Sequence, residues 1–167
     1  MHDRNTAPLE AWADALRTAL LQVVRHVNRP EVDAQIIAEA GVQLDRALFP
    51  VLSRVGVDTP VSVVELGDAL GKDHSTISRQ VAKLESLGLV RRRPAPQDGR
   101  VRLLEPTARG AEMLARISQA RRAMLIDRFE DWSPQDRDQL LTLLQRSVED
   151  PRPLARSHAS GHRDPGA

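Results

Sequence analysis

The chain of 167 residues contains no cysteine and no tyrosine, and aromatic residues make up only 2% of it. Without cysteine it can form no disulfide, no thiolate metal site, no iron–sulfur cluster and no thiol redox switch. Aliphatic side chains must therefore build the core. No apolar run approaches the roughly 18 residues of a membrane span. The N-terminus lacks the apolar stretch of a secretory signal, so we expect a cytoplasmic protein without a membrane partner.

The sequence also lacks the common signatures of enzymes. It holds no glycine-rich phosphate loop and no G-x-S-x-G or H-E-x-x-H motif. Ser75 and Ser78 lie near His74, but proximity in sequence is not a catalytic arrangement. His158 and His162 have the four-residue spacing of a helical metal site, yet the segment around them shows no helical pattern, which favours chance over metal binding. We expect no catalysis, no cofactor and no metal.

Basic residues are present, and they are unevenly distributed. The segment from Gly71 to Arg102 has eight basic and three acidic residues, a net charge of +5. Because the whole chain carries +1, the remainder carries −4. A basic block on an acidic body is typical of an anion-binding surface, although a solvated charged face gives the same count.

Apolar periodicity predicts two helical regions in the first third of the chain. From Pro8 to about Val27 apolar residues recur at steps of three and four, the spacing of one helical stripe. A second helical region follows Pro30, is divided near Gly41, and continues over residues 44–55. Pro50 lies inside this second piece, where its missing N–H is expected to kink or shorten the helix.

The middle of the chain predicts two more helices joined by a turn. Pro60 opens a short helix with its apolar contacts between Val61 and Leu70. After a turn at Gly71, either Asp73 or Ser75 can cap the next helix. That helix is expected to end at Gly88 in a left-handed conformation.

The rest of the chain predicts a hairpin, two helices and a tail. "LVRRR" and "RVRLLE" alternate as strands do, and "PAPQDG" between them supplies turn residues. A helix follows Thr107, and "SPQD" begins another with Ser133 as its cap. Residues 150–167 have no periodicity and are expected to be disordered. The fold class is therefore mainly α with a small β-hairpin.

The helix that ends near Gly88 has two contrasting faces. One is apolar and consists of Ile77, Val81, Leu84 and Leu87. The opposite face is small or polar and consists of Ser75, Ser78, Arg79, Ala82 and Ser86, with Lys83 at its edge. Small residues allow close approach to a groove wall, and an arginine can donate two hydrogen bonds to guanine. A short helix, a glycine turn and such a second helix indicate a helix-turn-helix, with the arginine-bearing hairpin as its wing.

These motifs resemble the MarR family of winged helix-turn-helix regulators. The resemblance rests on "STISRQVAKLESLGLVRRRPAPQDGRVRLLEPTARG" and extends over about residues 8–149. It implies that the helix after the turn enters the major groove, and that Asp98 orients Arg100 into the minor groove. The family's T-x-x-G matches Thr107 to Gly110. Pro106 departs from the family's usual leucine and leaves the reading helix intact.

Residues and resemblance together predict a sequence-specific transcriptional regulator that acts as a homodimer on double-stranded, pseudo-palindromic promoter DNA in the cytoplasm, at the nucleoid. Repression is the expected mode, and the alternative is an architectural winged-helix protein without an effector. We expect dimerisation helices at 1–59 and 107–149, a DNA-binding domain at 60–106 and a tail at 150–167. The expected DNA-binding residues are Lys72, His74, Ser75, Thr76, Ser78, Arg79, Lys83, Arg91, Arg92, Asp98 and Arg100.

The resemblance further implies a small effector, such as a phenolic acid, bound between the dimer body and the winged helix. The side chains able to stack on or neutralise such a ligand are Trp12, His26, Arg46, Phe49 and Arg54. For each of them a structural role is the competing interpretation: Trp12 and Phe49 as core residues, and Arg46 as the partner of a carboxylate.

Overall fold

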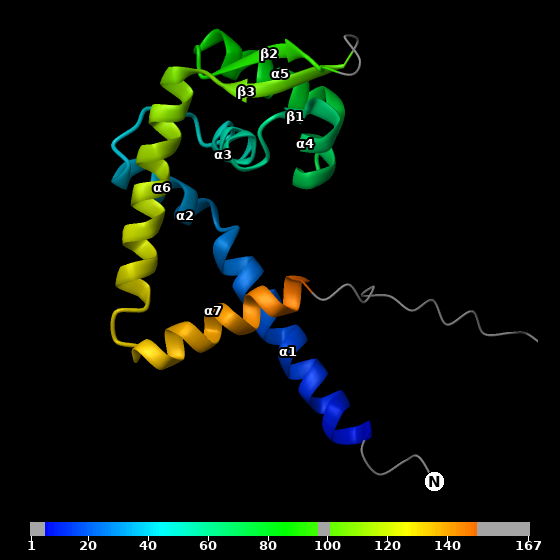
Figure 1. The fold of residues 1–167 in the computed structure, drawn as a ribbon, viewed down its shortest axis with the longest axis vertical. Helices are drawn as coiled ribbons and strands as arrows, with labels where there is room; N and C mark the ends of the chain where they lie inside the picture. Colours follow the sequence, from blue (N-terminus) through cyan, green and yellow to red (C-terminus); the bar gives the residue numbers. More distant parts are fainter. Residues whose placement is uncertain (1–5, 97–100, 150–167) are drawn as a thin grey trace, which may run out of the picture. The chain divides into compact units, whose positions relative to one another are not determined.

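The computed structural model describes residues 6–96 and 101–149, and the chain divides after Leu125 into two compact units (Figure 1). In chain order the helices and strands are α1 (Thr6–Val27), α2 (Pro30–Glu39), α3 (Phe49–Asp58), β1 (Val61–Ser62), α4 (Val63–Leu70), α5 (His74–Ser86), β2 (Val90–Pro94), β3 (Arg102–Pro106), α6 (Ala108–Arg128) and α7 (Pro134–Glu149). The prediction of a mainly helical protein with a small β-hairpin is confirmed. No helix in the described part of the chain is both long and apolar enough to cross a membrane.

A three-stranded antiparallel sheet replaces the expected two-stranded hairpin. Its strand order is β1-β3-β2. The prediction that Pro60 opens the short helix is wrong, because Val61 pairs with Leu104 as part of β1 and is buried. The helix α4 begins two residues later and is held by a capping box. Ser62 Oγ accepts from Glu65 N at 3.2 Å, and Ser62 N donates to Glu65 Oε2 at 2.7 Å. The hydrogen bond from Ser62 N to the ionised carboxylate, helped by the Ser62 side chain, holds the pKa of Glu65 below its usual value.

Pro50 starts a helix and does not kink one. The expected continuous stripe over residues 44–55 is wrong, because the chain is non-helical until α3 begins at Phe49, with Pro50 in its first turn. The N–H that proline lacks has no intrahelical partner in a first turn, so proline is tolerated there. Helix α3 therefore begins at Phe49, one residue before this proline, and four of its apolar side chains are buried: Phe49, Val51, Leu52 and Val55.

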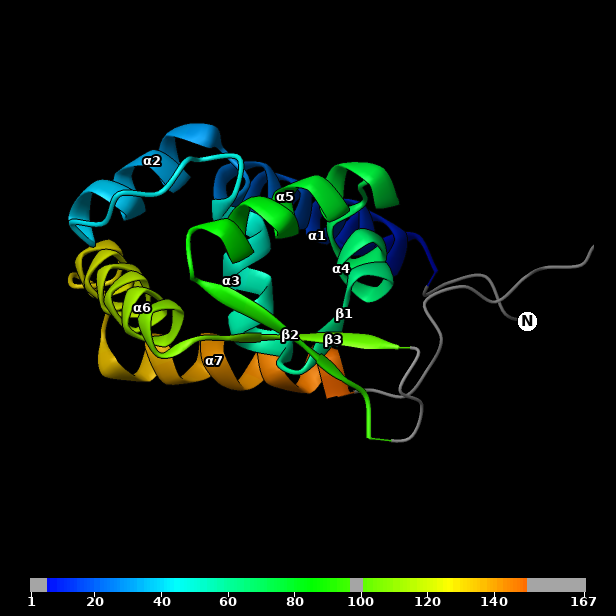
Figure 2. The ribbon, with the colours of Figure 1, turned by 90° about the horizontal axis from the view of Figure 1, so that it is seen from above.

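The main core lies beneath α5 and the hairpin, and it positions both. Its members are buried aliphatic side chains of α3, α4, α5, the strands and the adjoining turns: Leu48, Val51, Leu52, Val55, Val61, Leu66, Ile77, Val81, Leu84, Leu89, Val90 and Leu104. Figure 2 shows α5 and the β2–β3 hairpin on the same side of the molecule, with α3 behind them. Ile77, Val81 and Leu84 place the inner face of α5 in this cluster, and their hydrophobic burial holds the helix in place.

The start of α6 is fastened to the end of α5. Thr107 Oγ1 donates to Gly88 O at 2.6 Å and accepts from Gly110 N at 3.0 Å, while Thr107 N donates to Leu89 O at 3.1 Å. Gly88 has a φ of 67°, the left-handed conformation expected at the end of α5. Gly110 packs directly against the Leu89 backbone. The T-x-x-G motif is thus a junction between the reading helix, the wing and the long helix α6.

Substituting Gly110 with alanine is expected to lower the free energy of unfolding by about 3 kcal/mol, the upper part of the usual range for overpacking. A Cβ at this position would overlap the Leu89 carbonyl oxygen and lie 2.9 Å from its carbonyl carbon. Backbone atoms cannot rotate away as a side chain can. The clash therefore outweighs the roughly 1 kcal/mol that alanine gains over glycine inside a helix. Urea unfolding measures the change.

Gly56→Ala is the matched control, because its new Cβ would meet only side-chain atoms of Leu114, 2.8 Å from Cδ1 and Cδ2. A leucine side chain can change its rotamer, so the loss at Gly56 is expected to stay within about 1 kcal/mol. Equal losses in the two variants would contradict a rigid backbone contact at Gly110.

A second cluster joins α2, α3 and α6 around Phe49. Its buried members are Ile36, Ala40, Val42, Phe49, Ile117 and Ala120. The Arg121 guanidinium carbon lies 5.0 Å from the centre of the Phe49 ring, and Nη2 donates to Ser53 Oγ at 3.0 Å. Burial raises the pKa of Asp33, an effect that the nearby Arg121 and Arg46 guanidinium groups oppose. The Arg121 guanidinium thus packs on the Phe49 ring at the edge of an otherwise apolar cluster.

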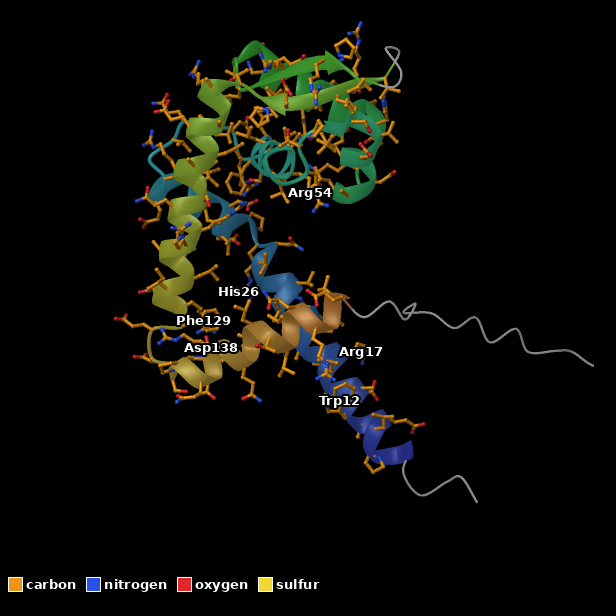
Figure 3. All side chains as sticks on the ribbon, in the orientation of Figure 1. Trp12, Arg17, His26, Arg54, Phe129 and Asp138 are labelled. Carbon is orange, nitrogen blue, oxygen red and sulfur yellow. The ribbon has the colours of Figure 1, made fainter. Side chains whose placement is uncertain are left out.

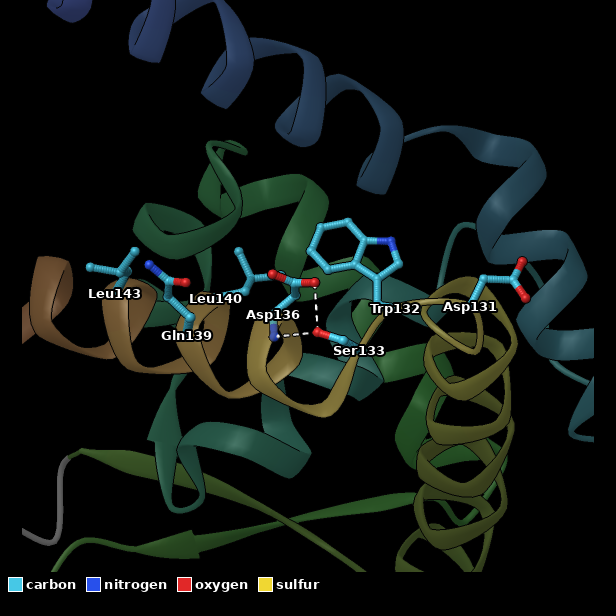
Figure 4. Close-up of a pocket in the computed structure, with 7 residues that line it drawn as sticks. All are labelled: Asp131, Trp132, Ser133, Asp136, Gln139, Leu140 and Leu143. Atoms are coloured by element: carbon cyan, nitrogen blue, oxygen red, sulfur yellow. Dashed lines mark hydrogen bonds between the residues drawn. The ribbon is translucent and has the colours of Figure 1, made fainter.

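The second unit contains the end of α6 and the helix α7. As predicted, Ser133 caps α7: Ser133 Oγ accepts from Asp136 N at 3.1 Å and donates to Asp136 Oδ2 at 2.7 Å (Figure 4). An open hollow beside this cap is lined by Asp131, Trp132, Ser133, Asp136, Gln139, Leu140 and Leu143. The leucines and the valine of α7 that follow are mostly exposed: Leu141, Leu143, Leu144 and Val148. The predicted disordered tail, with His158 and His162, lies outside the described residues.

Candidate nucleic-acid interface

The first turn of α5 is organised by Asp73. Asp73 is the N-cap, and its Oδ1 accepts from Thr76 N at 2.8 Å and from Ser75 Oγ at 2.6 Å. Of the two caps that the sequence allowed, Asp73 is therefore the one used. These hydrogen bonds stabilise the ionised carboxylate and hold the pKa of Asp73 well below its usual range. The cap fixes where α5 begins, and so fixes which side chains face outward.

Helix α5 separates its two faces as the sequence predicts. Ile77, Val81 and Leu84 are fully buried, and Leu87 at the C-cap is partly buried. The opposite face is open or half-open to solvent along its whole length: His74, Ser75, Ser78, Arg79, Ala82, Lys83 and Ser86. Lys72 is half-buried immediately before the helix. A rigid helix with small and donor side chains on its outer face is the arrangement that reads base edges in a major groove.

Hydrogen bonds within α5 orient its outer side chains. Arg79 Nη2 donates to Thr76 Oγ1 over 3.4 Å, one turn back. Ser78 Oγ lies 3.5 Å from His74 Nδ1. Both contacts are long and exposed, so they bias the side chains without locking them. On the inner side, Gln80 Nε2 donates to Ala47 O at 2.8 Å and ties α5 to the chain before α3.

The wing arginines are held in ion pairs. Arg91 on β2 is opposite Glu105 on β3, with Arg91 Nη2 2.6 Å from Glu105 Oε1. Arg92 points toward α5, and its Nε lies 3.1 Å from Glu85 Oε2. Arg91 and Arg92 are exposed residues, as expected for DNA-binding side chains, but each already has a carboxylate partner.

The sequence prediction missed the acidic partners of the wing. Glu85 enters it only in the count of acidic residues, and Glu105 only as the last residue of "RVRLLE". Their pairing depends on the hairpin register and on how α5 packs against β2. The sequence alone gives the wrong partner: with "PAPQDG" as the turn, Glu105 would fall opposite Gly88. In the structure Pro94 belongs to β2 instead, and Glu105 is opposite Arg91. Asp98 and Arg100, the expected minor-groove pair, lie outside the described residues.

The five residues proposed for a ligand do not form one site, and Figure 3 shows three of them, Trp12, His26 and Arg54, apart from one another. Trp12 and His26 are both exposed on α1, and 14 helical residues separate them by about 21 Å. Phe49 is 1% exposed and belongs to the second core cluster. Arg46 is exposed, and Arg54 forms an ion pair with Asp58. A single protomer therefore does not bring these five side chains into one site.

The fold is a winged helix-turn-helix of the kind found in transcriptional regulators. It consists of a short helix, a turn, a second helix with a buried ridge and an exposed polar face, and an arginine-bearing antiparallel hairpin. A model of the MarR family matches residues 43–101, which include α3, β1, α4, α5 and β2 and end just before β3. YxaD, an uncharacterized HTH-type transcriptional regulator of Bacillus subtilis strain 168, is 35% identical over 103 residues, which is 62% of this chain and 72% of YxaD.

Solved structures show the same fold. The structure of RV1404 from Mycobacterium tuberculosis has a TM-score of 0.61 at 25% identity, covering 84% of this chain and 94% of that one. Wild-type MarR from E. coli in its apo form has a TM-score of 0.59 at 23% identity, covering 77% and 96% of the two chains. The chain belongs to the MarR family. It has the DNA-binding fold of a transcriptional regulator, and its relatives are regulators and not enzymes.

Proposed function

We propose that the protein is a homodimeric regulator that binds a pseudo-palindromic site in promoter DNA, with α5 of each protomer in the major groove. The observation that carries this proposal is the exposed face of α5, polar and arginine-bearing, fixed by a fully buried ridge on the other side. The direct contacts are assigned to Lys72, His74, Ser75, Thr76, Ser78, Arg79, Lys83, Arg91, Arg92 and, outside the described residues, Asp98 and Arg100. Residues 60–106 form the DNA-binding part, and 1–59 and 107–149 the dimerisation parts.

Repression follows most directly from such binding, because a dimer seated on promoter DNA excludes the polymerase from it. The protein then works on the chromosome, in the cytoplasm. A small effector such as a phenolic acid releases the dimer from the DNA in this proposal. The effector is inferred from the family resemblance alone.

The experiment is a footprint of the purified full chain on promoter fragments. Two protected half-sites centred about 34 Å apart, one DNA turn, are expected from two copies of α5 on a two-fold axis. An architectural protein would instead bind all fragments with similar affinity. Uniform protection without a preferred sequence would therefore contradict the proposal of a sequence-specific regulator. The protein would then be a DNA-binding protein without sequence preference.

Exposed apolar side chains support the homodimer. Along α1 eight large apolar residues are exposed, each by 41% or more: Leu9, Trp12, Leu16, Leu20, Leu21, Val23, Val24 and Val27. Soluble monomers rarely leave an apolar stripe of this extent in water. The core beneath α5 is built from residues 48–104 without any side chain of α1, so α1 is not needed to cover it. A second copy of the chain is the commonest partner for such a face.

Leu20→Ala is expected to weaken the dimer by about 2–3 kcal/mol, because two copies of the leucine are lost from one symmetric interface. Analytical ultracentrifugation over a range of protein concentrations measures the shift toward monomer. Gln22→Ala is the matched control, since it changes the same helix away from the apolar stripe and should leave the dimer unchanged. A stable dimer in the Leu20 variant would place the interface elsewhere.

A further inference from the structure

One carboxylate on the wing faces two arginines. Glu105 Oε1 accepts from Arg91 Nε at 2.7 Å and lies 2.6 Å from Arg91 Nη2. Its other oxygen, Oε2, lies 2.8 Å from Arg93 Nε. The Arg93 contact is electrostatic only, because this buried Nε–H finds no hydrogen-bond acceptor among the described residues. Both arginines point to the same face of β2, two residues apart.

The sheet register accounts for this arrangement. Arg91 is directly opposite Glu105, and Arg93 is the diagonal neighbour, since it pairs with Leu103. Side chains two residues apart share a face, so one carboxylate on β3 reaches both arginines on β2. Leu104, between Leu103 and Glu105, points the other way and is fully buried in the main core. The charged cluster is therefore on the outer face of the wing, and the sheet is held by its inner face.

The contact is one that a DNA phosphate could replace. The Arg91 side chain is 67% exposed and that of Glu105 is 21% exposed. Exposed ion pairs contribute little to folding, whereas arginine binds phosphate in the same two-pronged geometry as carboxylate. A phosphate that binds the Nε–Nη2 edge of Arg91 must displace Glu105. At the other donors of Arg91 or Arg93 the nearby carboxylate repels the phosphate.

We propose that Glu105 is an intramolecular competitor of DNA phosphate for Arg91 and Arg93, and so a residue that lowers the protein's affinity for duplex DNA. This inference rests on the proposed function. The wing then contributes less to binding than its arginine count suggests, and more of the affinity must come from α5, which reads sequence. Glu85 also pairs with a wing arginine, but it joins α5 to β2, so its loss would change their relative placement as well as the charge.

The test is the affinity of the full-length Glu105→Gln variant for a duplex of arbitrary sequence, measured by fluorescence anisotropy against salt. Glutamine keeps one oxygen as the hydrogen-bond acceptor for Arg91, removes the negative charge, and has an NH₂ group in place of the other oxygen. Affinity is expected to rise roughly threefold to tenfold per protomer, the strength of one or two exposed ion pairs. The slope of log affinity against log salt should steepen by about 0.9 for each additional phosphate that the variant neutralises.

Glu112→Gln is the charge-matched control. Glu112 is exposed on α6, and no basic partner for it is found in the described part of the chain. It shows what the change in net charge does alone. A second arm places Glu105→Gln on a chain that already carries Arg91→Gln and Arg93→Gln, where the increase in affinity should shrink to the size of the Glu112 control. Circular dichroism of each variant verifies folding, and Glu105→Asp, which keeps the charge, should show no increase.

Equal affinities for the Glu105 and Glu112 variants would overturn the inference, and so would an increase that persists without the two arginines. A folded Glu105→Gln variant that binds duplex DNA more weakly than the natural chain would also overturn it. In that case the carboxylate would orient Arg91 and Arg93 toward the phosphates and would not compete with them. If the natural chain itself binds no duplex, the proposed function fails, and this inference fails with it. Duplex binding by the natural chain distinguishes the two failures: without it the proposed function fails, and with it only the role of Glu105 can fail.

Discussion

Raising the salt concentration from about 50 to about 200 mM is expected to lower the affinity of the protein for duplex DNA by about 10⁴-fold. Lys72, Lys83, Arg91 and Arg92 are the exposed or half-exposed cations around α5 and on β2 that we assign to phosphates. Two protomers then neutralise eight phosphates. At about 0.9 per phosphate the slope of log affinity against log salt is near −7, and a fourfold rise in salt gives the stated loss.

The size of the loss depends on whether the wing arginines leave their glutamates. If Arg91 and Arg92 stay paired, only the two lysines of each protomer remain, and the loss shrinks to about 10²-fold. Fluorescence anisotropy with a promoter duplex and with a duplex of arbitrary sequence measures both slopes. A response that is nearly flat on both duplexes would reject DNA as the partner.

The helix-turn-helix was predictable because local patterns decide it. Each buried residue of α5 comes from one apolar stripe, and that stripe is complete within the helix. Gly88 marks its end because a glycine after the last helical turn takes a positive φ at little cost. The capping residue was narrowed only to Asp73 or Ser75, since both side chains can accept a backbone N–H. In the structure Asp73 is the cap, and Ser75, in the first turn of α5, donates to the Asp73 carboxylate.

The errors arose where distant parts of the chain decide the conformation. The strand that begins at Val61 is only two residues long, too short for alternation to reveal it, and Val61 pairs with Leu104 more than forty residues later. Pro50 was placed inside a helix because Leu44 and Leu48 continue the apolar spacing. Those leucines contact the core from a non-helical segment instead. A helical spacing is therefore insufficient evidence of a helix when a proline interrupts it.

The sequence identifies the basic and polar residues of the candidate interface, but it does not show which of the arginines form ion pairs with carboxylates. Composition locates the basic segment, but a charge count treats Arg79 and Arg91 as equals. The structure separates them: Arg79 bonds only to the neutral Thr76 hydroxyl among its described contacts, whereas Arg91 is opposite a carboxylate. Register between strands depends on the turn and on the buried face together, so the pairing becomes visible only in three dimensions.

This difference makes Arg79 the side chain with the largest expected effect on sequence recognition. Arg79→Ala is expected to weaken binding to the specific site by about 1–3 kcal/mol for each half-site, hence about 2–6 kcal/mol for a dimer. The loss should fall on one base pair of each half-site, because a bidentate contact to guanine O6 and N7 distinguishes it from the other bases. Affinities for a set of duplexes, each with one base pair changed, locate that position.

Lys83→Ala is the matched control on the same helix. Lys83 is exposed at the edge of the polar face, where a phosphate is the nearest partner that a lysine can bind. Its loss should weaken all duplexes alike and reduce the salt slope by about 0.9 per protomer. Arg79→Lys keeps the charge but not the planar fork, so it should restore the affinity common to all duplexes and leave the base preference relaxed. If Arg79→Ala instead lowers every affinity by the same factor as Lys83→Ala, Arg79 contacts only phosphate, and sequence is read by other side chains of α5.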